Sequence, residues 1–258
     1  MILQGMLYDE KSSYQKGPAL APPLIREALQ SGAMNMYSET GVDIEKVIAM
    51  DVGDFGITDY WDIEKITREH LNSSKKVITL GGDHSITFPI IKAYQEHYPS
   101  LDIIQFDAHA DLYDIYEDDP YSHACPFARI MEHNLAVRLV QVGIRTLNTP
   151  QVEQARRFNV EIHQMKDIRE VKALRFQNPL YISLDMDVFD PAFAPGVSHH
   201  EPGGMSTRQV IDWIQQLDAN VVGADIVEYN PNRDFQNMTA FLSAKMLKEI
   251  AGKMVISA

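Results

Sequence analysis

Histidine and aspartate residues gather just after three short apolar runs of the 258-residue sequence. These runs span residues 77–80, 103–106 and 180–184. Side chains two residues apart on an extended strand point to the same face, so the polar residues that follow each run can converge. The sequence therefore predicts one cluster of six side chains, contributed by His84, Asp107, His109, Asp111, Asp185 and Asp187.

Four carboxylates in one cluster would repel one another and resist ionisation, and two divalent cations would remove this repulsion. Oxygen-rich sites with some imidazole suit manganese, whereas zinc more often takes three or four histidine or cysteine ligands. Iron, cobalt and nickel remain alternatives. A solvent molecule that bridges two such cations loses a proton near neutral pH and becomes a nucleophile. The pattern predicts a two-metal hydrolytic centre without specifying the bond that is cleaved.

Short apolar runs alternate with helical patterns along the whole chain. Strands are expected at 2–7, 46–51, 77–80, 103–106, 139–142, 180–184 and 221–226. Helices are expected at 22–29, 62–71, 86–97, 126–133, 151–158, 207–217 and 240–254. This alternation favours an α/β fold with a mainly parallel sheet covered on both faces, and in such sheets the chemistry lies beyond the carboxyl ends of the strands. No linker or repeat divides the chain, so residues 1–258 are expected to form a single domain.

The composition excludes some classes of function. The net charge is −13, which disfavours nucleic acid as a partner and favours a cationic substrate. No run of about 18 apolar residues is present, so no membrane span is expected. The first residues have no basic stretch before an apolar one, and the single cysteine, Cys125, cannot form an intramolecular disulfide. These observations favour a cytoplasmic protein.

Four motifs carry a resemblance to a known family. They are Gly-Gly-Asp-His-Ser at 81–85, Phe-Asp-Ala-His-Ala-Asp at 106–111, Ser-Leu-Asp-Met-Asp-Val-Phe-Asp-Pro at 183–191 and Asp-Ile-Val-Glu-Tyr-Asn-Pro at 225–231. In these motifs, and in their order and spacing over nearly the whole chain, the sequence resembles the ureohydrolases, which include arginase and agmatinase. The resemblance implies a three-layer α/β/α sandwich around a mainly parallel eight-stranded sheet, assembled into trimers or hexamers.

The resemblance also implies a role for each motif residue. His84 and Asp111 would complete the shell of one Mn²⁺ ion, His109 and Asp187 that of the other, and Asp107 and Asp185 would bridge both. Glu228 would hold the substrate guanidinium, whose N–H donors pair well with a carboxylate. His123, in Tyr-Ser-His-Ala-Cys-Pro-Phe at 121–127, matches the proton-shuttling histidine of the family. The implied reaction releases urea and an amine.

Two segments bear on the specificity for the substrate. Residues 111–123 resemble a compact agmatinase loop, and the Ser/Thr/Asn-rich loop typical of arginases is not found at 112–122. We expect the acidic residues of this loop, which favour a cationic tail, to meet the far end of the substrate: Asp114, Glu117, Asp118 and Asp119. At 197–200 the chain reads Val-Ser-His-His where many agmatinases have Thr-Gly-Thr-Pro, so His199 and His200 are expected to contact substrate.

The leading hypothesis is an agmatinase-like enzyme that acts on a small cationic guanidino compound. Arginase, guanidinobutyrase, guanidine hydrolase and formimidoylglutamase are the alternatives on the same fold, and Pro-Gly-Val-Ser at 195–198 is reminiscent of formimidoylglutamase. From other classes, a non-catalytic scaffold would have no reason to retain the complete ligand set. A dinuclear phosphoesterase is disfavoured by the scarcity of lysine and arginine near the motifs.

Overall fold

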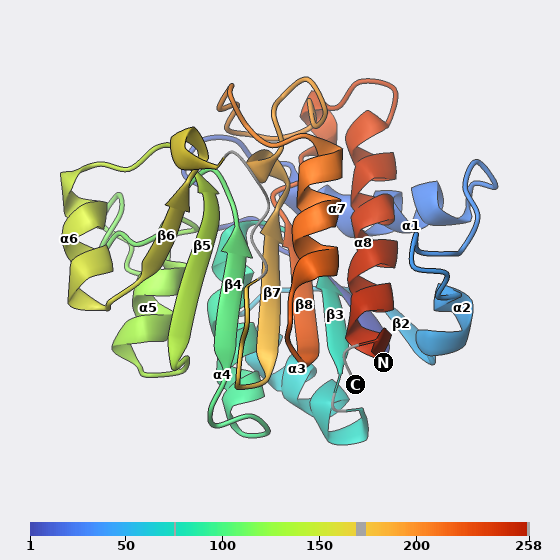
Figure 1. Cartoon of the computed structure of the whole chain (residues 1–258), viewed down its shortest axis with the longest axis horizontal. Coiled ribbons are helices and arrows are strands. Elements are labelled where there is room, and N and C mark those ends of the chain that lie inside the picture. The colour runs from blue at the N-terminus through green and yellow to red at the C-terminus, as the bar shows by residue number, and fades with distance from the viewer. Residues whose placement is uncertain (75, 169–173, 257–258) are drawn as a thin grey trace.

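A central sheet of eight strands forms the middle layer of the molecule, as seen in a computed structural model that describes residues 1–74, 76–168 and 174–256 (Figure 1). Every pair of neighbouring strands is parallel, and the spatial order is β2-β1-β3-β8-β7-β4-β5-β6. The strands are β1 (Ile2–Leu7), β2 (Met50–Gly56), β3 (Val77–Leu80), β4 (Asp102–Phe106), β5 (Arg138–Ile144), β6 (Glu161–Gln164), β7 (Leu180–Asp185) and β8 (Val221–Val227).

Helices cover both faces of this sheet (Figure 1). On one face α1 (Ala21–Gln30), α2 (Ile44–Val47) and α7 (Thr207–Gln216) pack against the long α8 (Met238–Ile256). On the other face α4 (Thr87–Gln95) packs between α3 (Asp62–Ser73) and α5 (Pro126–Glu132), and α6 (Thr149–Arg157) lies beside β6 at the end of the sheet. The expected three-layer sandwich around an eight-stranded sheet is confirmed.

Two apolar clusters hold the layers together, one on each face of the sheet. Successive residues of a central strand contribute to opposite clusters: Ile103 belongs to one and Ile104 to the other, and both are fully buried. Continuous apolar runs suit strands that are covered on both sides. This is why the strands β3, β4, β7 and β8, which position the motifs, fall where the sequence predicts them.

The two edge strands depart from the prediction. Residues 46–51 are not one strand, because the Asp43 side chain accepts a hydrogen bond from the Glu45 amide and starts the short helix α2 before β2 begins at Met50. Strand β6 has no counterpart among the predicted elements. Edge strands pair on one side only and are half-exposed, so their sequences lack the continuous apolar run of a central strand.

Candidate active site

The six clustered residues lie together at the carboxyl edge of the sheet. His84 follows β3, Asp107 follows β4, and Asp185 is the last residue of β7. A repeated local turn orients them: Asp107 Oδ1 accepts a hydrogen bond from the His109 amide at 2.6 Å, and Asp185 Oδ1 accepts one from the Asp187 amide at 2.7 Å. In this turn, typical of aspartate, Oδ1 accepts the amide hydrogen bond, and the Oδ2 atoms of both residues lie near His84 Nδ1.

Two groups of potential ligand atoms share Asp107. In the first, His84 Nδ1 lies 3.1 Å from Asp107 Oδ2 and 3.0 Å from Asp111 Oδ2, and Asp185 Oδ2 is 3.2 Å from the same nitrogen. In the second, His109 Nδ1 lies 2.8 Å from Asp187 Oδ2 and 3.6 Å from Asp107 Oδ1. The two oxygens of Asp107 thus face different groups, as expected of a bridging carboxylate.

The His84 ring shows that the first group suits a cation. Nδ1 is buried and has no hydrogen-bond partner among the described residues, although three carboxylate oxygens surround it. On the other side of the ring, Nε2 lies 2.9 Å from Ser183 Oγ, whose hydroxyl donates to Asp225 Oδ1 at 2.7 Å. Because that hydroxyl proton is already donated, Ser183 Oγ accepts from Nε2–H, and Nδ1 is the ring atom that faces the carboxylates.

The pKa values of the clustered carboxylates are shifted in opposite directions. Burial, together with the Asp187 and Asp107 charges, raises the pKa of Asp185 well above its usual value. Burial and the Asp107 charge raise the pKa of Asp111 to about 6. Burial also opposes ionisation of Asp107, but its hydrogen bonds with the two cluster histidines hold that pKa low. Divalent cations would keep all of these groups ionised, and the mixed oxygen and imidazole donors fit two such ions.

Glu228 and His123 form a buried pair beside the cluster. Glu228 follows β8 with φ at 62°, and its amide donates to the Gly82 carbonyl at 2.9 Å. Its Oε1 accepts from the His84 amide at 2.8 Å and lies 2.9 Å from His123 Nδ1. Burial lowers the pKa of His123, but the Glu228 charge outweighs this and raises the pKa to about 9. The pair can therefore carry both a negative charge and a mobile proton.

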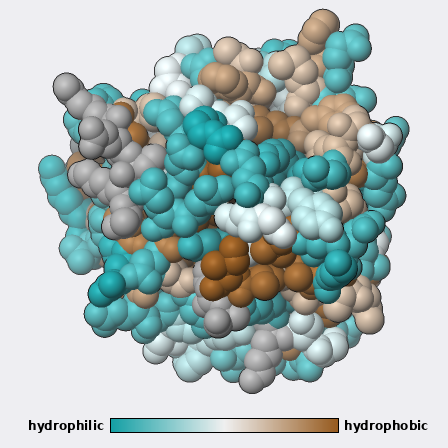
Figure 2. Space-filling model, turned by 45° about the vertical axis from the view of Figure 1, so that its right-hand side comes forward, coloured by the Kyte–Doolittle hydropathy of each residue, from teal (hydrophilic) through white to brown (hydrophobic). Residues whose placement is uncertain are grey.

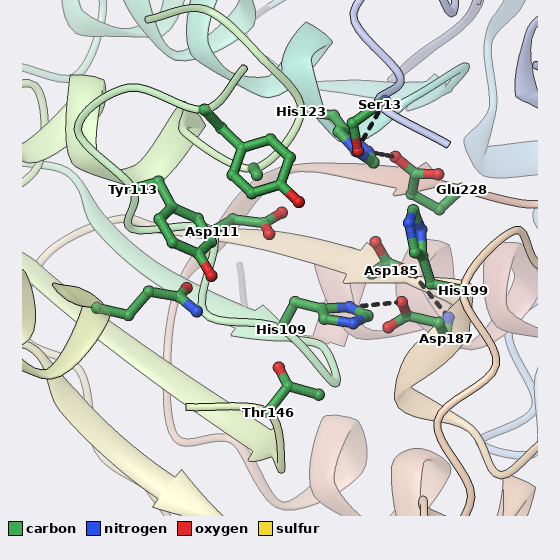
Figure 3. A pocket seen from close by; sticks show the side chains of 13 residues that line it. Ser13, His109, Asp111, Tyr113, His123, Thr146, Asp185, Asp187, His199 and Glu228 are labelled. Atoms are coloured by element: carbon green, nitrogen blue, oxygen red, sulfur yellow. Dashed lines mark hydrogen bonds and ion pairs between the residues drawn. The ribbon is translucent and has the colours of Figure 1, made fainter. Parts of the chain in front are cut away.

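A cavity of about 200 Å³ opens above the cluster (Figure 3). Four of the six cluster residues line it, and His84 and Asp107 lie buried beneath. The complete lining consists of Ser13, His109, Asp111, Tyr113, Tyr116, His123, Ala124, Thr146, Gln151, Asp185, Asp187, His199 and Glu228. The structure thus brings together all six expected metal ligands with His123, Glu228 and His199.

His199 and His200 differ in their placement. The His199 ring packs on Tyr14, His109 and His123, with ring centroids 5.4, 5.7 and 5.4 Å away. His200 is exposed, and its Nε2 lies 2.7 Å from the Pro195 carbonyl oxygen, so it lies outside the cavity lining. Adjacent residues of this loop point in different directions, and only one of the two expected imidazoles reaches the cavity.

The acidic loop does not supply the far wall of the cavity as expected. Asp114 pairs with Arg129 at 2.5 Å and Asp119 with Lys11 at 2.6 Å, and Glu117 and Asp118 are exposed. None of these four acidic residues lines the cavity. Their place is taken by neutral polar groups that the sequence analysis did not single out: Tyr113, Tyr116, Thr146 and Gln151.

Ser13 is another lining residue that the sequence analysis missed. It comes from the segment after β1 and reaches His123 across 110 residues of sequence (Figure 3). No motif marks it, because the contact depends entirely on how that segment folds over the sheet edge. The sequence did give a weak indication that Tyr113 and Tyr116 line the cavity, since both lie within the segment expected to meet the substrate.

Known proteins resemble this chain along nearly its whole length. The sequence model of the Arginase family matches residues 1–252. Mitochondrial arginase 1 of Arabidopsis thaliana is 42% identical over 98% of this chain and 80% of the relative, and an agmatinase of Bacillus cereus is 31% identical over 97% and 90%. The solved structure of an arginase from Medicago truncatula superposes with a TM-score of 0.93 at 39% identity, covering 98% of this chain and 86% of that one.

Proposed function

Because this chain belongs to the arginase family, and is a metal-dependent hydrolase of guanidino C–N bonds, we propose that it converts a linear guanidino compound with a cationic tail, such as agmatine, to an amine and urea. The observation that carries this proposal is the Glu228–His123 pair beside the two ligand groups, on one wall of a single cavity. A carboxylate for the guanidinium and a proton source for the leaving amine are both within that cavity.

Each residue of the site would have a distinct role in the reaction. His84 and Asp111 would hold one Mn²⁺ ion, and His109 and Asp187 would hold a second. Asp107 and Asp185 would contribute to both. These cations would supply an activated water as the nucleophile. Glu228 keeps its negative charge next to His123 and can accept hydrogen bonds from the guanidinium N–H groups. His123 can move a proton toward the departing nitrogen.

The outer part of the cavity supports a tail without a carboxylate. Tyr113, Tyr116, Thr146 and Gln151 are neutral, and no described residue that lines the cavity is a lysine or an arginine. A carboxylate on the tail would therefore meet no cationic partner there. A protonated amine would experience the field of a chain with net charge −13 and of an inner site built from carboxylates.

Arginine is the second candidate substrate, because two observations favour it. The relative named arginase is 42% identical to this chain and the relative named agmatinase 31%. The phenol and amide groups of the outer cavity can also donate hydrogen bonds to a carboxylate. Guanidinobutyrate, guanidine and formimidoylglutamate remain alternatives, and a scaffold without activity is the alternative of another class.

A urea-release assay with manganese-loaded protein tests the proposal. Agmatine, arginine, guanidinobutyrate, guanidine and formimidoylglutamate are compared in parallel at one protein concentration. We expect the highest kcat/KM for agmatine. A higher kcat/KM for arginine would establish the second candidate, and formamide from formimidoylglutamate without urea from the others would overturn the choice of reaction. No product from any compound, with two metals bound, would identify a scaffold.

We also propose that the protein is a cytoplasmic homo-oligomer, a trimer or a hexamer. The side of the molecule that carries α8 and α1 shows apolar side chains gathered in one area within a mostly polar surface (Figure 2). Contact with another copy would remove such an area from water. No helix of the described residues is long and apolar enough to span a membrane. Sedimentation equilibrium measures the assembly, and cell fractionation tests the compartment.

A further inference from the structure

The segment that follows β1 is fastened across the edge of the site. The Asp83 amide donates to the Tyr8 carbonyl at 3.0 Å, and the Lys11 amide donates to Asp83 Oδ2 at 3.0 Å. The carbonyl of Lys11 in turn accepts a hydrogen bond from the His123 amide at 3.2 Å. The segment thus joins the end of β3 to the loop that carries His123, and it holds the next residues, Ser12 and Ser13, in place.

Ser13 contacts the imidazole nitrogen of His123 that faces away from Glu228. The Ser13 amide donates to His123 Nε2 at 3.2 Å, and Ser13 Oγ lies 2.8 Å from the same atom. A backbone amide can only donate, so Nε2 is an acceptor here and the ring proton lies on Nδ1, next to Glu228 Oε1. Both nitrogens of His123 therefore have a partner, and both partners, Ser13 and Glu228, line the cavity together with the ring (Figure 3).

We propose that the Ser13 hydroxyl relays the proton between His123 Nε2 and the cavity, an inference that rests on the proposed function. Ser13 lines the cavity, and its Oγ lies 2.8 Å from Nε2. A hydroxyl can donate to a neutral Nε2 and accept from a protonated one, but the amide cannot reverse. The amide thus opposes protonation of Nε2, whereas the Glu228 charge raises the pKa of the same ring to about 9. The ring can therefore take up a proton at Nε2 and release it again, and the hydroxyl gives this proton a route.

The proton balance of the reaction is closed by this route. Water adds its oxygen to the guanidino carbon, and the C–N bond to the tail breaks with its electron pair on the departing nitrogen. Both protons of the water end on that nitrogen. One of them uses the relay: Ser13 Oγ accepts the water proton as the hydroxyl proton moves to His123 Nε2. On return, Nε2–H goes back to Oγ as the proton that Oγ took from water moves to the amine. Ser13 and His123 finish each turnover unchanged.

Substitution of Ser13 separates a relay from simple positioning of the ring. Ser13→Ala keeps the amide that holds Nε2 but removes the hydroxyl, so we expect kcat to fall about 100-fold with KM changed by less than about threefold. Ser12→Ala is the matched control, because it removes a neighbouring hydroxyl that contacts only Asp83 in the same segment. It should retain kcat within about threefold. The assay uses the full, manganese-loaded chain with the best of the five compounds.

An isosteric pair keeps the test decisive if Ser13→Ala disturbs folding. Ser13→Thr retains a hydroxyl and Ser13→Val does not, so the relay requires Thr to be active and Val to lose kcat to the level of Ala. Equal kcat values for Ser13→Thr and Ser13→Val would refute the relay. A Ser13→Ala variant in which only KM changes would refute it as well. Wild-type urea release would still leave the proposed function standing in that event, whereas its absence would refute the proposed function itself.

Discussion

The cluster of six histidine and aspartate residues and the outer rim of the cavity, which includes Tyr113, Tyr116 and His199, are held in place in different ways. Cluster residues lie directly at strand ends, and His84 and Asp107 are completely buried and held by hydrogen bonds to their neighbours. The rim comes from the loops around Tyr113, Tyr116 and His199, which are only partly buried. The sheet register dictates where the cluster lies, but only contacts between loops decide what faces the rim. Substitutions should therefore have smaller effects with increasing distance from the strand ends.

The largest effect is expected for a proposed metal ligand. Asp187→Ala removes the carboxylate that faces His109 at 2.8 Å, so the second group of ligands loses an anionic donor. We expect the protein to retain about one manganese per chain and kcat to fall on the order of 10³-fold. Metal content by atomic emission and urea release measure both. Full activity with two metals bound would contradict the assignment of the cluster.

A smaller effect is expected one layer below the ligands. Asp225→Asn weakens the contact that orients Ser183 and, through it, the His84 ring. Partners of metal-bound histidines typically affect metal affinity by about 10- to 100-fold, and we expect a loss in that range. Manganese titration followed by calorimetry checks it. Asp212→Asn serves as the control, since that residue lies on α7, away from the cavity lining, and its side chain accepts a hydrogen bond from Arg208.

At the rim the effect should depend on the tail of the substrate. Tyr116→Phe removes one hydroxyl at the cavity wall, and one hydrogen bond contributes about 0.5–1.5 kcal/mol, or roughly a two- to tenfold change in KM. We expect this change with agmatine but not with guanidine, which has no tail to reach the rim. A fall in kcat with both compounds would show that the hydroxyl acts on the chemistry instead.

The smallest effect is expected in the acidic loop. Glu117→Gln and Asp118→Asn each remove a charge that is exposed and lies outside the cavity lining. Screening by salt weakens such charges, so KM for agmatine should change by less than about twofold at physiological ionic strength. A larger rise in KM would show that the acidic loop does help to select a cationic tail. It would also show that residues outside the cavity lining contribute to substrate binding.

The same contrast explains what could be predicted from the sequence. Strands β3 and β7 were predicted to within one residue, because burial on both faces leaves a continuous apolar run. The polar side chains that follow the strands lie together, as the sequence predicts, and their role as metal ligands stays a prediction. His123 and Glu228 required the family motifs, since a lone histidine and a lone glutamate have no signature of their own. Ser13 gave no signal, because its role depends on a contact across 110 residues.

The position of β8 in the sheet has a consequence for how the protein is synthesised. This last strand lies between β3 and β7, so it joins a half made from β1, β2 and β3 to a half made from β4 to β7. His84 belongs to the first half and Asp107 and Asp185 to the second. The sheet edge that carries the ligand set becomes continuous only once β8 has inserted between the two halves. Binding of the proposed manganese pair would then come at the end of folding, and its retention would report that the fold has been completed.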